Sequence, residues 1–393
     1  MPSARLIGRV FDDNVRDEPR THVFIIGVGQ YGYGRGPEAT DIASGLDQLT
    51  SPPKSAAAIA NYFINEFANE DHPLGTVTML VSGGLSAADR VVFGIPARLP
   101  RATLRNVKKA MEQWKSAFQD HVGNMLVFYF CGHGVSLGQK AAMLLEDFGN
   151  DDNGYEPAIE LDTLRGTLMK AMPSKQLFLV DCCRTAADHA YKHEASLGTR
   201  VLSITRDDRP RGQLPRQSVL VPTLDGQVAF GELEEVSVFT SCFLDAVRFA
   251  GVSNDSGKWS STVAQIHDAV GKLVDHRLRR DMREKSVPTG KDVTNFEFNH
   301  VDAPTVARSI VAIDDVVTSP VTITATETAG AGHLPKTMIK QSHEPYRCCT
   351  FQLEFGRWRF DGTPGITPPY LHPEEREIFP QRPVVYVELK GRP

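Results

Sequence analysis

Two short apolar runs, each ending in reactive side chains, constrain this chain more than any other feature. The first spans residues 125–134 and ends in a His-Gly pair at His133; the second spans residues 177–184 and ends around Cys183. Runs of this length, rich in bulky and β-branched side chains, are typical of buried strands in a parallel sheet. Functional sites in open α/β sheets form at the carboxyl ends of the strands. We therefore expect His133 and Cys183 to face one crevice.

A thiol and an imidazole brought together suit nucleophilic catalysis. The thiolate is the nucleophile, and a neighbouring imidazole can take up the thiol proton and later return it to a leaving amine. A tetrahedral intermediate also needs hydrogen-bond donors, which the backbone N–H groups of Gly134 and Cys183 can supply. Either residue alone would more often be structural, since a free cysteine packs as a small hydrophobe. The two together predict an active site.

With these motifs the chain resembles the caspase-like cysteine peptidases, that is, caspases, metacaspases and their bacterial relatives. The His-Gly pair of the family corresponds to His133 and Gly134, and the Asp-x-Cys motif of metacaspases to Asp181, Cys182 and Cys183. The separation of about fifty residues between His and Cys is also that of the family. The resemblance implies a cysteine endopeptidase in which Cys183 attacks the peptide carbonyl and His133 is the acid/base. It assigns no third catalytic residue.

The resemblance also implies where substrate binds. In metacaspases the acid two residues before the nucleophile, here Asp181, faces an Arg or Lys at the P1 position, where a carboxylate pairs well with a guanidinium. The alternative is that Asp181 only caps the turn through backbone N–H groups. A second acid of the family is replaced by Ser55, and either Asp41 or Asp47 could substitute for it. Asp225 lies in the expected substrate-lining loop.

Relatives of this kind are often activated by a cut after the Cys strand, and residues 185–217 are long, polar and basic. This segment is either a processing loop, cut in cis or by an upstream protease, or a flexible insertion. By analogy, a zymogen-like protease in bacterial defence or regulated cell death would fit. A catalytically silent scaffold that binds a protein partner is the alternative. The candidate cut sites are Arg200, Arg206, Arg209, Arg211 and Arg216.

A GxGxxG pattern follows the first apolar run, at Gly27, Gly29 and Gly32. A dinucleotide fingerprint needs the third glycine inside an opening helix and an acidic residue at the next strand end. Here the chain continues as Gly-Arg-Gly-Pro, which does not propagate a helix. We therefore interpret the pattern as a loop at the rim of the cleft, and a dinucleotide-binding enzyme is the third hypothesis, after the peptidase and the silent scaffold.

An acidic turn around residues 146–154 raises the question of calcium, because many metacaspases depend on it. An EF-hand template fits Asp151, Asn153, Gly154 and Glu160, but puts Gly149 at the first ligand position. We expect a solvated turn and assign no metal or other cofactor.

Composition restricts the class of protein. The chain has 393 residues, 41% apolar and 23% charged, with a net charge of −5. Mild acidity argues against nucleic-acid binding, which normally needs a basic face. The first residues show no apolar signal segment and no run is long enough to span a membrane. With two vicinal cysteine pairs and no metal-type spacing, a reduced cytoplasmic protein acting on protein substrates is expected.

The order of elements predicts an α/β fold, a caspase-like mostly parallel sheet flanked by helices. Residues 1–20 are read as an extension and residues 21–300 as the peptidase domain. Residues 301–393 contain 11 of the 25 prolines and short alternating runs, typical of a small β-rich C-terminal domain. The expected strands include residues 22–29, 77–81, 141–145 and 218–223, and the expected helices include 51–67, 103–122, 161–172, 237–244 and 261–283.

Overall fold

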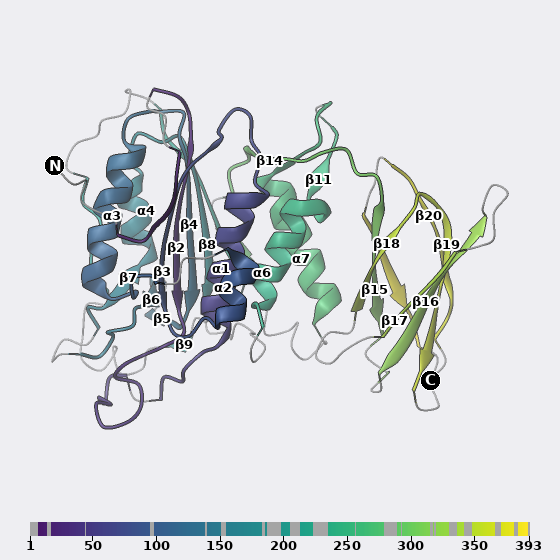
Figure 1. Cartoon of the computed structure of the whole chain (residues 1–393), viewed down its shortest axis with the longest axis horizontal. Helices are drawn as coiled ribbons and strands as arrows, with labels where there is room; N and C mark the ends of the chain where they lie inside the picture. Colours follow the sequence, from purple (N-terminus) through teal and green to yellow (C-terminus); the bar gives the residue numbers. More distant parts are fainter. Residues whose placement is uncertain are drawn as a thin grey trace. The chain divides into compact units, whose positions relative to one another are not determined.

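The structure, a computed structural model, describes most of the chain (Figure 1). The residues are grouped into two compact units: Met1–Leu244 with Pro288–Asn299, and Asp245–Val287 with His300–Pro393. Each unit is considered by itself. The described residues are 7–13, 17–43, 45–94, 98–137, 140–150, 155–182, 185–186, 198–204, 213–222, 235–255, 257–278, 289–291, 293–314, 317, 320–329, 336–341, 348–365, 371–380 and 384–391.

Unit 1 is built on a seven-stranded sheet whose five central strands are parallel. The two edge strands run antiparallel to their neighbours. The mostly parallel α/β sheet predicted from the sequence is confirmed. In spatial order the strands are β1 (Arg9–Asp12), β3 (Leu74–Ser82), β2 (Thr21–Val28), β4 (Met125–Gly132), β8 (Lys175–Cys182), β10 (Arg216–Val221) and β13 (Thr289–Lys291).

The central strands are buried because helices cover both faces of the sheet (Figure 1). On one face lie α1 (Ser51–Asn65), α2 (Ala87–Phe93) and α6 (Val238–Asp245); on the other lie α3 (Leu104–Phe118) and α4 (Leu161–Leu168). Every residue of β2 and β4 is buried, which explains their unbroken apolar sequences.

Two helices illustrate how the sequence sets these elements. Helix α1 has proline in its first turn, where no intrahelical N–H bond is lost. Helix α3 is capped by Thr103, whose hydroxyl accepts from the N–H of Asn106 at 3.4 Å. Its apolar stripe is core, as predicted: Trp114 is fully buried, with its ring centroid 5.3 Å from that of Phe24 on β2.

A small second sheet, which the sequence did not predict, lies beside the carboxyl end of β4. It consists of β7 (Ala158–Glu160), β6 (Lys140–Leu144), β5 (Gly134–Leu137) and β9 (Thr185–Ala186). The predicted strand over residues 141–145 belongs here, and not to the main sheet. Strand β5 follows His133 directly, so the chain turns from one sheet into the other at the predicted active site.

Within the predicted loop over residues 185–217, several of the described residues pair with other strands or are buried, so these parts are not a flexible insertion. Thr185–Ala186 pairs with β5, and Thr199 forms a parallel bridge with Ile159 on β7. Val201, Leu202 and Ile204 are buried in the main core. Apolar residues in a polar, basic context carry too weak a periodic signal to be recognised as a core segment.

Two glycines of the GxGxxG pattern, Gly27 and Gly29, serve packing, and the pattern lacks the opening helix that a dinucleotide fingerprint needs. A Cβ atom at Gly29 would lie 2.3 Å from the Leu49 carbonyl oxygen, and one at Gly27 would lie 2.7 Å from that of Pro52. Both positions need glycine because the start of α1 approaches the end of β2 closely. The next helix begins only at Ser51, far beyond Gly32.

Unit 2 contains two small sheets packed face to face. One sheet has the order β18-β15-β21 and the other β17-β16-β19-β20. Alternation along β19, with Trp358 and Phe360 buried and Arg357 and Arg359 exposed, explains how short alternating runs form this core. The strands are β15 (Ala307–Ile313), β16 (Val321–Ala329), β17 (Thr337–Gln341), β18 (Cys348–Leu353), β19 (Gly356–Pro364), β20 (Glu374–Ile378) and β21 (Val384–Leu389).

The same unit includes residues 245–287, which the sequence analysis had placed with the peptidase domain. They form a π-helical turn, η1 (Ala246–Ala250), two short strands and α7, whose capping box at Thr262 fixes its start. The elements are β11 (Val252–Ser253), β12 (Ser260–Thr262) and α7 (Val263–Arg277), and β14 (Glu297–His300) crosses the boundary between the units.

Candidate active site

The predicted crevice lies where β4 and β8 end side by side. These strands are parallel neighbours, and their last residues, Gly132 and Cys182, are paired in register. His133 follows the first strand immediately. Cys183 follows the second but lies outside the described residues, as does Arg184. Because neighbouring strands are about 4.8 Å apart, Gly132 and Cys182, the residues just before His133 and Cys183, are adjacent at this edge of the sheet.

The His133 ring is held by a backbone carbonyl. Its Nε2 atom lies 2.8 Å from the carbonyl oxygen of Asp47. A carbonyl only accepts, so Nε2 carries the hydrogen, and in the neutral ring Nδ1 keeps a lone pair. Burial lowers the pKa of His133 to about 4, which keeps the ring neutral at pH 7. A neutral imidazole with a free Nδ1 lone pair is the form that a general base requires.

Tyr31 holds the main chain of the same histidine. The His133 backbone N–H donates to the Tyr31 hydroxyl at 2.6 Å, and the two rings lie with centroids 4.8 Å apart. Gly132 makes this approach possible, because a Cβ there would lie 2.8 Å from the Tyr31 hydroxyl oxygen. Neither Tyr31 nor the Asp47 carbonyl was recognised in the sequence. Every residue has a carbonyl, so no residue-type signal could have identified Asp47.

Asp181, the last but one residue of β8, lies in a buried polar cluster. Its side chain accepts hydrogen bonds from the hydroxyls of Ser237 and, at 2.6 Å, Thr240. Ser237 also caps α6, since its hydroxyl accepts from the Thr240 N–H at 3.1 Å. Asp181 is 3% exposed. Its partners among the described residues are side-chain hydroxyls, and the turn of the capping alternative, residues 183–184, lies outside the described residues.

Two residues of β4 complete the cluster around Asp181. Burial raises the pKa of Asp181, and hydrogen bonds from Ser237, Thr240, Cys131 and Tyr129 act in the opposite direction. Burial also raises the pKa of the Cys131 thiol, which therefore stays protonated and can donate. Asp181 and Cys131 thus point to the same face of the sheet. Among the described residues of this cluster, Asp181 is therefore a single acid surrounded by neutral donors.

Comparison with known proteins identifies the family. The sequence matches the family described as the caspase domain over residues 20–300. This chain belongs to the caspase-domain family. The match includes β2, β4 and β8, and both motifs at which the two strands end.

The individual relatives are distant. The uncharacterized protein y4kE of Sinorhizobium fredii is 28% identical over 228 residues, covering 56% of this chain and 62% of that protein. Caspase-1 from Spodoptera frugiperda is 14% identical, with a TM-score of 0.42 and coverage of 74% of this chain and 94% of that one. Protein GSU0716 from Geobacter sulfurreducens is 12% identical, with a TM-score of 0.37 and coverage of 72% and 95%. Scores this low add nothing to the family match.

The two acids proposed to replace the missing family acid do not join the Asp181 cluster. Asp41 is exposed. The Asp47 carboxylate forms an ion pair with Arg35, and its backbone carbonyl contacts His133. The position of the missing acid is occupied by Ser55 on α1, whose hydroxyl accepts from the Ser237 N–H at 2.9 Å. Serine therefore links α1 to the cluster without adding charge.

Several predicted site residues lie outside the described residues. These are Asp225, Arg206, Arg209 and Arg211, together with Asp151, Asn153 and Gly154 of the calcium template. Of that template, Glu160 is described, and it accepts from the Thr163 hydroxyl at 2.5 Å at the start of α4. The predicted solvated turn without a metal stays a prediction, and calcium stays its alternative. Gly134 begins β5 opposite Met143, and its role as an oxyanion donor also stays a prediction.

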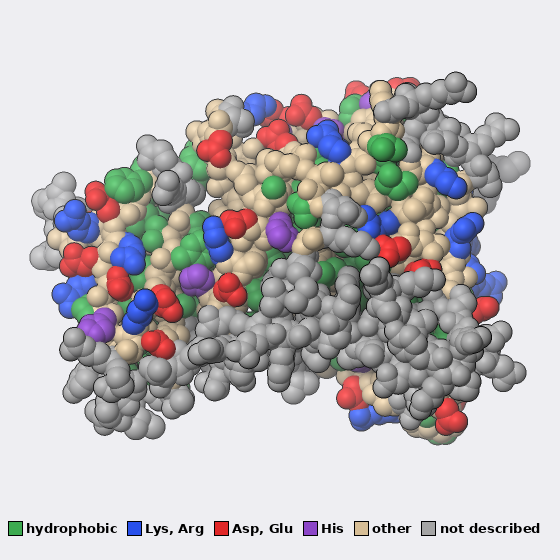
Figure 2. Space-filling view, turned by 180° about the vertical axis from the view of Figure 1, so that it is seen from behind, with side chains coloured by type: hydrophobic (Ala, Val, Ile, Leu, Met, Phe, Trp, Pro, Cys, Tyr) green, Lys and Arg blue, Asp and Glu red, His purple; other side chains and the backbone are tan. Residues whose placement is uncertain are grey.

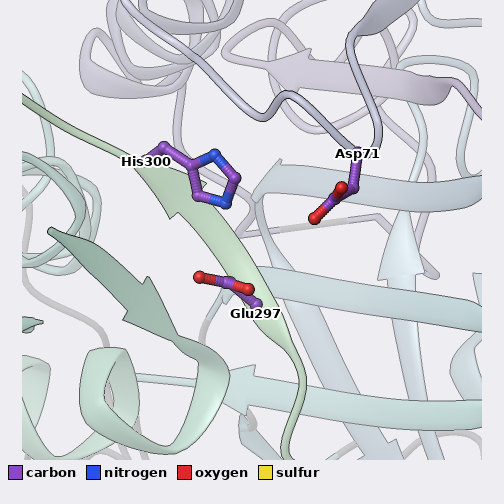
Figure 3. A group of neighbouring side chains, drawn as sticks. All are labelled: Asp71, Glu297 and His300. Atoms are coloured by element: carbon purple, nitrogen blue, oxygen red, sulfur yellow. The ribbon is translucent and has the colours of Figure 1, made fainter. Parts of the chain in front are cut away.

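Figure 3 draws a group of neighbouring side chains of metal-ligating type, namely Asp71, Glu297 and His300. Asp71 and Glu297 belong to unit 1, whereas unit 2 resumes at His300, so the group crosses the boundary and is not assigned as a metal centre. Within unit 1 both carboxylates interact with the Lys175 ammonium. This cation offsets part of their negative charge.

Charged side chains of both signs are found at the surface of the protein. On the face drawn in Figure 2, Lys and Arg side chains are interspersed with Asp and Glu. Within the part of the chain that the structure describes, no helix combines the length and apolar character needed to cross a membrane. The predictions about nucleic acid and cellular location stay predictions.

Proposed function

We propose that this protein is a cysteine endopeptidase with Cys183 as nucleophile and His133 as acid/base. The observation that carries the proposal is the state of His133: neutral, with Nε2 bound to the Asp47 carbonyl, at the point where β4 ends beside β8. The register of the two strands supports it as well. Cys131 and Asp181 are paired neighbours, and they stand two positions before His133 and Cys183 in the sequence.

In the proposed reaction, His133 Nδ1 accepts the Cys183 thiol proton while Nε2–H stays on the Asp47 carbonyl. The thiolate attacks the substrate carbonyl carbon, and the oxyanion is stabilised by the N–H groups of Gly134 and Cys183. The C–N bond then breaks, and Nδ1–H donates its proton to the leaving amine. Water, deprotonated by Nδ1, attacks the thioester, and the acid product and thiol are released. The substrates would be proteins.

We further propose that the P1 residue is Arg or Lys, bound by Asp181. The carboxylate is the one acid among the described residues of its hydroxyl-rich cluster. A guanidinium or ammonium arriving there would add a charge pair to the hydrogen bonds that the carboxylate accepts, and a guanidinium can bind it in bidentate fashion. The reverse specificity, for P1 Asp, would place two carboxylates together at a large cost.

The test uses purified wild-type protein with fluorogenic peptides that carry Arg, Lys or Asp at P1. The panel is run with and without calcium, before and after limited nicking within residues 185–217. We expect cleavage of the Arg and Lys peptides. Cleavage of Asp peptides alone would refute the specificity but keep the enzyme. No cleavage under any of these conditions would refute the peptidase and favour the scaffold alternative.

Self-processing, if it follows this specificity, is expected to avoid Arg200 and Arg216. A protease binds its substrate as an extended segment. Arg200 lies between the bridged Thr199 and the buried Val201, and Arg216 begins β10, with its N–H on the Ser174 carbonyl at 2.7 Å. Cutting either would require removing a core segment or a strand from unit 1.

The remaining predicted cut sites are Arg206, Arg209 and Arg211. We expect their triple change to glutamine to abolish cleavage within residues 185–217, measured by mass spectrometry of the fragments. The matched double variant Arg200→Gln/Arg216→Gln is expected to be cut as the wild type is. Loss of the cut in the double variant, with its retention in the triple variant, would contradict this assignment.

A further inference from the structure

The loop that follows β2 has a first arm that contains Tyr31 and a second arm that contains Asp47 and Gln48, and the two arms are joined at their base. It runs from Gly29 to Thr50, and we call its described residues, 29–43 and 45–50, the histidine loop. The Leu49 N–H donates to the Gly29 carbonyl at 2.7 Å, which closes the base. The Gln48 side chain then pairs with the backbone of Tyr31: its Oε1 accepts from the Tyr31 N–H at 2.8 Å and its Nε2 donates to the Tyr31 carbonyl at 2.9 Å. The Gln48 amide thereby binds both the N–H and the carbonyl of one residue on the other arm, as the backbone of a neighbouring strand would.

Each arm makes one of the two contacts that hold His133. The first arm supplies the Tyr31 hydroxyl to the His133 backbone N–H, and the second supplies the Asp47 carbonyl to Nε2. Gln48 therefore directly follows Asp47, whose carbonyl binds the His133 ring. Its hydrogen-bond partner is Tyr31, whose hydroxyl binds the His133 main chain. The first arm is in turn tied to the core, because the Gly32 N–H donates to the Glu146 carbonyl at 3.1 Å.

We propose that Gln48 is a positioning residue of the active site, whose amide holds the Asp47 carbonyl on His133 Nε2. The inference rests on the proposed function and deepens it. Gln48 is exposed and touches neither the ring nor a reacting atom, so it acts through the loop. Without the amide the second arm is attached to the first by the Leu49–Gly29 hydrogen bond at the base and by the exposed Arg35–Asp47 ion pair, which contributes little, so the carbonyl can leave the ring. His133 then loses the acceptor that selects its Nε2–H tautomer.

The kinetic test compares Gln48→Met, which keeps the length of the side chain and removes both hydrogen bonds, with wild-type protein. We expect kcat to fall about 10- to 100-fold while KM changes less than about threefold, because the reacting group and not the substrate is displaced. Glu38→Gln, an exposed change in the same loop, is the matched control and should retain wild-type kinetics. Tyr31→Phe, which removes the hydroxyl acceptor, should show the same split between kcat and KM.

The second readout needs no activity, so it separates failure of this proposal from failure of the proposed function. Nitrogen NMR of the His133 ring is recorded in Cys183→Ala protein with and without Gln48→Met. With Gln48 present we expect the Nε2–H tautomer and a pKa near 4, because burial disfavours the charged ring. The charged side chains of the loop beside this contact, Arg35 and Asp47, are paired with each other.

In Gln48→Met we expect a mixture of tautomers and a pKa that moves up toward the ordinary value of 6.5, since water reaches the ring. An unchanged tautomer and pKa in Gln48→Met would overturn the inference, whatever the kinetics. If Gln48→Met fails to fold, the ring spectrum of Gln48→Ala, which removes the same two hydrogen bonds, decides in the same way. If wild-type protein cleaves nothing but the ring responds as expected, the positioning role holds and only the peptidase proposal fails.

Discussion

Replacing Cys183 by alanine is expected to lower kcat for P1-Arg peptides by about 10⁴- to 10⁶-fold, because the covalent step is lost entirely. His133→Ala should have a similar effect, since without a base the thiol stays mostly protonated at pH 7. The effects of residues that act as one unit are not additive. The kcat of the double variant should therefore lie within about threefold of that of the slower single variant. The measurement is steady-state kinetics at saturating peptide.

Cys182→Ala is the matched control for the nucleophile. Cys182 is the last residue of β8 and is 4% exposed in the main core, on the opposite side of the chain from Asp181. Its loss should cost about 1 kcal/mol of stability through a small cavity and leave kcat within about threefold. If Cys182→Ala removes activity and Cys183→Ala retains it, the nucleophile is Cys182 and our assignment of Cys183 is wrong.

Asp181→Asn is expected to lower kcat/KM for P1-Arg peptides by about 10²- to 10³-fold. A buried guanidinium left without its carboxylate loses roughly 3–4 kcal/mol, and each 1.4 kcal/mol is a factor of ten. Asparagine has nearly the same shape, so the cluster with Ser237 and Thr240 can still form. Burial raises the pKa of Asp181, so neutralising the residue should not lower the melting temperature by more than a few degrees.

A neutral P1 residue provides the internal control for this variant. With glutamine at P1, the wild-type protein and Asp181→Asn should differ by less than about tenfold, because no charge pair is at stake. An equal loss for P1 Arg and P1 Gln would mean that Asp181 supports the fold of the cluster and does not select the substrate. Retained preference for Arg would remove Asp181 from the binding site altogether.

Much of unit 1 could be predicted from local patterns. The unbroken apolar runs of β2, β4 and β8 identify strands buried on both faces, and such strands are found in parallel sheets. The Trp114 stripe and the prolines of α1 identify helices that cover the sheet. Because parallel strands end at a common edge, the residues after β4 and β8 had to be neighbours. The His-Gly and Asp-x-Cys motifs then pointed to the family.

The tertiary structure decided what the local patterns do not encode. Val201 and Leu202 joined the core although their polar surroundings predicted a loop, because burial depends on a bridge to β7 that is distant in sequence. Asp181 was expected to face substrate or backbone, and its actual partners come from α6, about sixty residues later. Side-chain hydroxyls at such separations have no periodic signature.

The same holds for the contacts that set the chemistry of His133. Its residue type and its place after a strand follow from the sequence, so the candidate acid/base could be named. Its tautomer and lowered pKa depend on a carbonyl and on burial, both supplied by a loop about ninety residues earlier. The sequence by itself determined which groups could react; only the folded loop decided their protonation state, because hydrogen bonding and desolvation exist only once those segments meet.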